Sequence, residues 1–133
     1  MRDSSPADSQ QRFASIAAAH PGLRLLVLFG SRARGDARVE SDWDLGYLGD
    51  AGLDPDALLL DLVKSLGTDR VDLVDLARAG AQIRFRAASE GRAVHEAEAG
   101  VFDRFWIDAV DFWCDVEPLL RAGYADVLAR LRR

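Results

Sequence analysis

Two aspartates one position apart, Asp42 and Asp44, are the residues best suited to chemistry, and they stand at the head of an apolar run. Alternate side chains of a strand point to the same face, so both carboxylates are expected to project together, from Cα atoms about 7 Å apart. Two like charges this close repel each other, and a divalent cation removes that conflict. Because Mg²⁺ prefers carboxylate oxygens together with substrate phosphates, the pair predicts a site for magnesium and a nucleotide.

A glycine–serine turn precedes the aspartates by ten residues and follows the almost wholly apolar segment 23–29. Gly30 lets the backbone approach a phosphate closely, because it has no Cβ. Ser31 offers a hydroxyl and a backbone N–H, and a helix beginning there would favour an anion. The side chains of Arg32 and Arg34 can offset the charge of a triphosphate. We therefore expect these four residues to bind the nucleotide.

A third carboxylate would complete a two-metal site, and the expected strand at residues 70–76 offers Asp72 and Asp75. Three positions separate them, so their side chains face opposite ways. Asp72 lies between apolar neighbours, where a bare buried charge would be costly without a partner. This favours Asp72 as the third ligand. Asp75 is the alternative, although its place near the strand end also suits a cap on the next helix or a solvent-facing position.

The apolar periodicity and the Gly and Pro breaks predict the elements that position these residues. Capping by Ser4 or Ser5 before Pro6 predicts a helix start there. The segment 30–41 is expected to be a loop or a short helix. Further helices are expected at 6–19, 55–66 and 79–90, and strands at 23–29, 43–48, 70–76 and 92–95.

The last third of the chain carries apolar and aromatic residues at helical spacing. It predicts C-terminal amphipathic helices at 98–133, interrupted near Pro118. The aromatic stripe from Phe102 to Trp113 is interpreted as core, with a surface for a partner protein as the alternative. Together with a core at 1–97, these helices form a single expected domain, 1–133, of the α/β (α+β) class with one small sheet.

Composition narrows the classes of function. The chain has 133 residues and a net charge of −5, which argues against direct nucleic-acid binding. Cys114 is the single cysteine, so no internal disulfide can form and a reducing cytoplasm is expected. No segment approaches the length of a membrane span, and no membrane partner is expected. His20, beside the Pro21-Gly22 turn, is interpreted as a surface residue.

These motifs resemble the DNA polymerase β-like nucleotidyltransferase superfamily, and most closely its minimal nucleotidyltransferases. The family pattern is Gly-Ser, ten residues, then Asp-x-Asp, and the stretch from Gly30 to Asp44 matches its spacing. The segment Val71 to Leu76 resembles the family's third-acid strand, and the end of the chain resembles the tail of MntA-type antitoxins of HEPN/MNT systems. The resemblance implies a small mixed β-sheet flanked by helices, with a helical C-terminal extension.

The resemblance also implies an activity. Such antitoxins transfer AMP from ATP, with two Mg²⁺ ions, to a tyrosine of a HEPN-family (HepT-like) ribonuclease toxin. By the same resemblance Asp42 and Asp44 hold both metals, and Asp72 is a metal ligand that helps to activate the attacking hydroxyl. Gly30 and Ser31 hold the β- and γ-phosphates.

Two other functions are compatible with the sequence. One is nucleotide transfer to a small molecule, as in aminoglycoside nucleotidyltransferases, although those carry a larger substrate-binding portion. The other is a non-catalytic antitoxin that neutralises its partner by binding, against which the intact Gly30-Ser31 pair and the three acids argue. Nothing in the sequence selects the base of the nucleotide.

Overall fold

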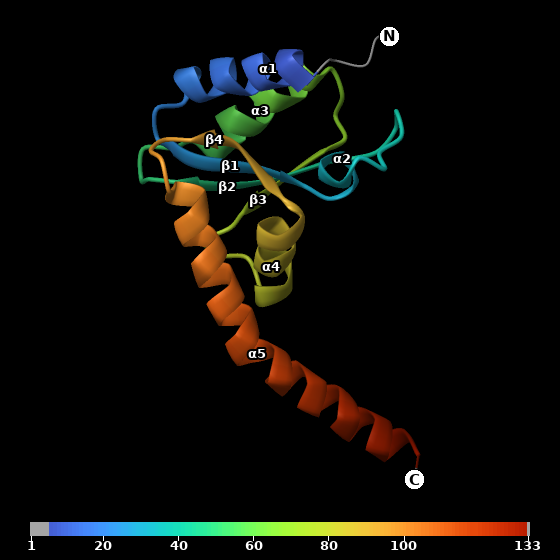
Figure 1. Ribbon diagram of the computed structural model, residues 1–133. Helices are drawn as coiled ribbons and strands as arrows, with labels where there is room; N and C mark the ends of the chain where they lie inside the picture. The colour runs from blue at the N-terminus through green and yellow to red at the C-terminus, as the bar shows by residue number, and fades with distance from the viewer. Residues whose placement is uncertain (1–5, 133) are drawn as a thin grey trace.

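A four-stranded sheet in the order β3-β2-β1-β4 forms the centre of the molecule. The computed structural model describes residues 6–132 (Figure 1), so the expected cap at Ser4 and Ser5 lies outside the described residues. The strands are β1 (Leu23–Phe29), β2 (Trp43–Gly49), β3 (Val71–Asp75) and β4 (Arg92–Glu96). The helices are α1 (Pro6–Ala19), α2 (Ser31–Arg34), α3 (Pro55–Leu66), α4 (Ala81–Glu90) and α5 (Val101–Leu131).

The sheet is mixed, as expected. Strand β1 pairs antiparallel with both β2 and β4, while β2 pairs parallel with β3. Helix α3 lies in the crossover between the parallel strands β2 and β3, which a hairpin cannot join. The expected strands agree with the structure to within one residue at most ends.

Two layers of helices cover the sheet, with α1 and α3 on one face and α4 and α5 on the other (Figure 1). Strand β1 has an apolar sequence with no polar alternation because both of its faces are buried. Leu26 and Leu28 pack toward α1 and α3, while Leu25, Val27 and Phe29 pack toward α4 and α5. Strand β1 therefore contributes side chains to both cores, and Gly30 follows its last residue directly.

The ends of α3 show why the sequence folds as expected. The Asp54 carboxylate accepts hydrogen bonds from the N–H groups of Asp56 and Ala57, and Pro55 occupies the first turn. Gly67 closes the helix in the left-handed conformation with φ of 69°. These caps fix the point at which the chain turns back to form β3.

The C-terminal region departs from the expectation of several helices. It is one continuous helix, α5, that passes through Pro118 without ending. A proline removes one backbone hydrogen bond and clashes with the preceding turn, but a helix can bend around it when the flanking residues are good helix formers. Leu119, Leu120 and Arg121 follow Pro118 and are such residues, so the helix continues.

The two halves of α5 have different surroundings. In the first half Phe105 and Ala109 are buried, and the Trp113 ring stacks on Phe85 of α4 with centroids 5.1 Å apart. The second half, residues 118–131, extends away from the body (Figure 1). Its apolar side chains are exposed, among them Leu119, Leu120, Tyr124, Val127, Leu128 and Leu131. Between residues 6 and 132 no helix is both long and apolar enough to cross a membrane.

Deletion of residues 118–133 should leave the fold intact, because exposed side chains contribute little to stability. We expect the free energy of unfolding to change by less than about 0.5 kcal/mol.

Trp113→Ala should lower the free energy of unfolding by about 2 kcal/mol, since it removes the stacked ring that fixes α5 to α4. Thermal and urea unfolding of both variants check this, and a large loss on deletion would show that the second half is packed in solution.

Candidate active site

Asp44 lies in the second position of β2 and is fixed by pairing on both sides. It is opposite Phe29 of β1 and opposite Asp72 of β3. Its strand neighbours Trp43 and Leu45 pack against the α1 and α3 layer, so the Asp44 carboxylate projects from the face that α4 covers. The side chains of Asp44 and Asp72 share that face because they are register partners.

The environment raises the pKa of Asp44 above its ordinary value. Burial is the main cause, followed by repulsion from Asp72 and, more weakly, from Asp42. Arg86 and Arg34 act in the opposite direction and lower the pKa of this carboxyl, but they do not offset the rise. Asp42 is thus close enough to Asp44 for its charge to raise the pKa of that carboxyl. Asp42 itself precedes the first residue of β2 and is exposed.

The geometry separates the two candidates for the third acid. Asp72 is the register partner of Asp44, whereas Asp75 is the partner of Tyr47, whose ring belongs to the opposite core. Asp75 accepts a hydrogen bond from the N–H of Ala77 at 3.0 Å, a cap on the turn that follows β3. The argument from burial was wrong, however: Asp72 is exposed, because β3 is an edge strand of the sheet.

Gly30 is required by Asp44 as well as by the turn. Its φ of 74° lies in the left-handed region, which L-residues rarely adopt. A Cβ placed on Gly30 would collide with Oδ2 of Asp44. The backbone at the end of β1 thus lies directly against the Asp44 carboxylate. Gly30 was expected to lie close to a phosphate, and in the structure it lies close to this acid.

Ser31 and Arg34 begin and end the single turn of α2. Ser31 is half-buried and follows Gly30 directly, at the first position of α2. Arg34 makes ion pairs with Asp36 at 3.4 Å and with Glu90 of α4 at 3.1 Å. Its positive charge lowers the pKa of Asp44, and its expected contact with a phosphate stays a prediction.

Arg32 has a different place from the one expected. Its guanidinium donates hydrogen bonds to the backbone carbonyls of Ser41 at 3.0 and 3.2 Å and of Val39 at 3.1 Å. The group also lies over the Trp43 ring, 4.2 Å from its centroid. The side chain is engaged with the loop after α2, because that loop folds back across the turn, and it is not directed at the acids.

Sequence reasoning did not identify Arg86 and Glu90 of α4. The Arg86 guanidinium lies 5.7 Å from the centroid of the Phe29 ring and 3.8 Å from Glu90. Glu90 therefore joins Arg86 and Arg34, the two cations that act on Asp44. The four-residue spacing of Arg86 and Glu90 indicates a helical ion pair, but only the packing of α4 on β1 reveals that the pair borders the acids.

The carboxylates suit a divalent cation without forming a closed cage. Among the side chains that the structure describes, no three of His, Cys, Asp or Glu are grouped closely enough to hold a metal ion. Two carboxylates on one face and a raised pKa for Asp44 are nevertheless the chemistry that a hard cation relieves. Mg²⁺ commonly completes its ligand set with waters and substrate phosphates, so an incomplete protein set fits this ion.

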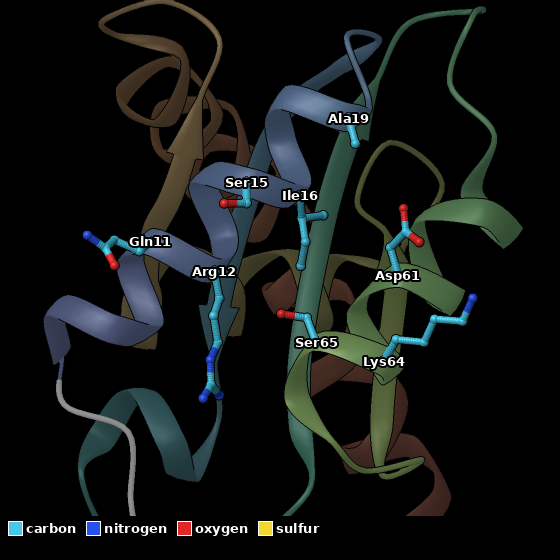
Figure 2. A pocket seen from close by; sticks show the side chains of 8 residues that line it. All are labelled: Gln11, Arg12, Ser15, Ile16, Ala19, Asp61, Lys64 and Ser65. Atoms are coloured by element: carbon cyan, nitrogen blue, oxygen red, sulfur yellow. The ribbon is translucent and has the colours of Figure 1, made fainter.

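One surface groove lies away from the acids. It has a volume of about 720 Å³ and lies between α1 and α3 (Figure 2), the layer opposite to the one that Asp44 faces. Asp61 lines it and accepts a hydrogen bond from His20 at 2.6 Å. His20 was interpreted as a surface residue, but its side chain is 10% exposed and paired.

Comparison with known proteins gives this arrangement a family. Residues 11–99 match the model of the family described as polymerase beta, nucleotidyltransferase, which includes every acid discussed above. The chain belongs to this nucleotidyltransferase family. The match ends before α5, so the long C-terminal helix lies outside the part that defines the family.

The chain is also similar to individual members. It is 32% identical to the protein adenylyltransferase MntA of Aphanizomenon flos-aquae (strain 2012/KM1/D3) over 98 residues, which cover 64% of this chain and 65% of that relative. The matched part of this chain thus spans somewhat less than two thirds of the relative's length.

Two solved structures share the fold. One is a toxin–antitoxin with AMP-PNP, with a TM-score of 0.76, 24% identity and coverage of 90% of this chain and 98% of that chain. The other is a tri-AMPylated Shewanella oneidensis HEPN toxin in complex with MNT antitoxin, with a TM-score of 0.69, 24% identity and coverage of 90% and 95%. Each match covers 90% of this chain, so the structural similarity includes the helices as well as the sheet.

Gly30→Ala should destabilise the protein more than Gly35→Ala. Both glycines have positive φ, but a Cβ on Gly35 meets nothing within 4 Å, whereas one on Gly30 meets the Asp44 carboxylate. We expect a cost of about 1 kcal/mol for Gly35→Ala, from backbone strain alone, and about 2–4 kcal/mol for Gly30→Ala. Chemical unfolding measures both, and equal costs would contradict the contact.

Asp44→Asn should stabilise the nucleotidyltransferase at neutral pH. The folded state raises the pKa of Asp44, so folding favours its protonated form. The stabilising contribution of the carboxyl is present below its unfolded pKa and is lost as pH rises through its folded pKa. The Asn variant should therefore have a higher Tm than the parent at pH 7, with the difference disappearing near about pH 3. Asp69→Asn, at an exposed turn, is the control; a lower Tm for Asp44→Asn at pH 7 would indicate a favourable contact.

Proposed function

We propose that this chain is a Mg²⁺-dependent adenylyltransferase that transfers AMP from ATP to a tyrosine of a HEPN-family (HepT-like) ribonuclease toxin, and so acts as its antitoxin. The observation that carries the proposal is the register of β2 with β3, which brings Asp44 and Asp72 together beside Gly30. Similarity to a relative named a protein adenylyltransferase supports AMP as the transferred group.

The residues divide the reaction between them. Asp42 and Asp44 would hold Mg²⁺, which when bound neutralises phosphate charge and favours ionisation of a hydroxyl. Gly30 and Ser31 would bind the β- and γ-phosphates through backbone N–H groups and a hydroxyl, and Arg34 adds positive charge beside them. Positioning and charge neutralisation are the main requirements of phosphoryl-type transfer, and these side chains supply both.

The transfer step exchanges a phosphoanhydride bond of ATP for a phosphoester bond to tyrosine. The tyrosine oxygen attacks the α-phosphorus, the bond from that phosphorus to the oxygen bridging the β-phosphate breaks, and pyrophosphate leaves. The hydroxyl proton passes to a carboxylate. Asp72 suits this role because it is exposed at the sheet edge, where a large acceptor can approach, while Asp44 is held against Gly30.

A protein acceptor is consistent with the shape of the molecule. Asp72 is exposed on the edge strand β3, and the second half of α5 presents exposed apolar residues, including Leu120, Tyr124 and Val127, on a helix that extends from the body (Figure 1). Exposed apolar surface of this kind commonly marks contact with another protein. A structural relative is described as an MNT antitoxin in complex with an AMPylated HEPN toxin.

Intact-mass measurement of a HEPN partner after incubation with this protein, ATP and Mg²⁺ tests the proposal. We expect the partner to gain one or more AMP units and pyrophosphate to be released. Asp42→Asn with Asp44→Asn should reduce the rate by at least about a thousandfold without loss of fold. Asp69→Asn, a carboxylate away from the site, should transfer at the parental rate.

The other outcomes select the competing functions. A stable complex that neutralises the partner with no gain of mass would establish a non-catalytic antitoxin. Transfer of AMP to an aminoglycoside-type small molecule, with none to the protein partner, would establish small-molecule transfer. Transfer that survives the double Asn substitution would show that the metal ligands are assigned wrongly.

A further inference from the structure

The Arg32 side chain joins the turn that carries Gly30 to the loop that carries Asp42. Its Nη2 donates to the carbonyl oxygens of Val39 and Ser41 at 3.1 and 3.0 Å, and at 3.4 Å to that of Arg38. Its Nε donates to the Ser41 carbonyl at 3.2 Å. One guanidinium thus binds three carbonyls of the loop, those of residues 38, 39 and 41, and the last of these residues immediately precedes Asp42.

The other contact of this guanidinium is with the first residue of β2. Its central carbon lies 4.2 Å from the centroid of the Trp43 ring. The Trp43 ring is itself fixed, because it packs edge-on against the buried Phe13 of α1 with centroids 6.3 Å apart. Arg32 therefore ties the loop on one side of Asp42 to an anchored ring on the other side.

The loop is closed by its own bonds and is held from β3 as well. Ser41 N donates to the Arg38 carbonyl at 3.0 Å, and Arg38 N donates to the Ser41 hydroxyl at 2.7 Å. Arg70 Nη1 donates to the Glu40 carbonyl at 2.7 Å. The path of the chain into Asp42 is thus set by two arginines that bind backbone oxygens, Arg32 from α2 and Arg70 from the position just before β3.

Arg32 and Arg34 divide two tasks although they share one turn of helix. Arg34 faces Glu90 and acts on Asp44, while the donors of Arg32 are used on carbonyls of the loop. A guanidinium can bind several acceptors in fixed directions and also lie flat on an aromatic ring. An ammonium is a point charge and cannot do both, so lysine is not an equivalent at this position.

We infer that Arg32 is a positioning residue for the metal ligands: by holding residues 38–41 against Trp43 it sets where Asp42 lies relative to Asp44, and hence the affinity of that pair for a divalent cation. The inference rests on the proposed function for the use of that cation. Arg32 makes its contribution through Asp42, without touching nucleotide.

Arg32→Lys tests this, with Arg38→Lys as the matched control on the exposed part of the same loop. Both are studied in the full chain without nucleotide, with Mn²⁺ alone as the probe. Amide exchange at residues 36–41 should become about tenfold faster in Arg32→Lys. The Kd for Mn²⁺, followed by electron paramagnetic resonance, should rise about tenfold. Arg38→Lys should change each quantity less than about twofold.

A double-mutant cycle separates positioning from a general loss of structure. If Arg32 acts through Asp42, Arg32→Lys should have no further effect on the Mn²⁺ affinity of an Asp42→Asn variant. Full additivity of the two substitutions overturns the inference, and so does faster loop exchange with unchanged Mn²⁺ affinity. No Mn²⁺ binding by the parent protein, or weaker ATP binding at unchanged Mn²⁺ affinity, also overturns it.

Failure of the proposed function is distinguished from these outcomes. If the parent protein binds Mn²⁺ but adds no AMP to any partner, the adenylyltransferase proposal fails. The effect of Arg32 on the metal pair is then still measured, because exchange and Mn²⁺ affinity are determined without nucleotide or partner.

Discussion

The contact between the Gly30 backbone and the Asp44 carboxylate is the constraint on which the site depends. Antiparallel pairing of β1 with β2 places Phe29 opposite Asp44, so the residue after the strand must turn immediately beside the carboxylate. A Cβ at this position would force the Asp44 side chain to move, and the positive φ of Gly30 starts the single turn of α2. The positions of Ser31, Arg34 and the loop to Asp42 follow from this turn.

The site also holds charge in an arrangement that does not favour the folded state. Asp44 is partly buried next to two other carboxylates, and the cations Arg34 and Arg86 offset only part of the repulsion. The fold tolerates this because Asp42, just before β2, and Asp72, on the edge strand β3, are both exposed. A local conflict of this kind is expected where a protein gives up some stability for function.

Much of this arrangement could be predicted from the sequence. The apolar runs and the Gly and Pro breaks locate the strands and helices. The expectation that Asp42 and Asp44 share one face stays a prediction, because Asp42 precedes the first residue of β2. The family's fold and the mixed sheet agree with the resemblance. The choice of Asp72 over Asp75 as the neighbour of Asp44 also agrees with the register, although the residue is exposed and the reason given was wrong.

What could not be predicted depends on contacts between distant segments. Arg32 was expected at a phosphate, but its donors meet carbonyls of a loop whose return path has no periodic signal. Arg86 reaches the acids only because α4 packs on β1. The continuation of α5 through Pro118 depends on the balance between one lost hydrogen bond and the helix propensity of the following turns.

The crossover through α3 has a consequence for the order in which the chain assembles. Gly30 and Asp44 are close in sequence, so they can meet as soon as β1 and β2 pair. Asp72 reaches Asp44 only after the parallel pairing of β2 with β3, which closes a longer loop and is slower to form. We therefore expect Asp42 and Asp44 to be in place before Asp72 during folding, so that the mutual repulsion of the carboxylates arises late, when the apolar cores can offset it.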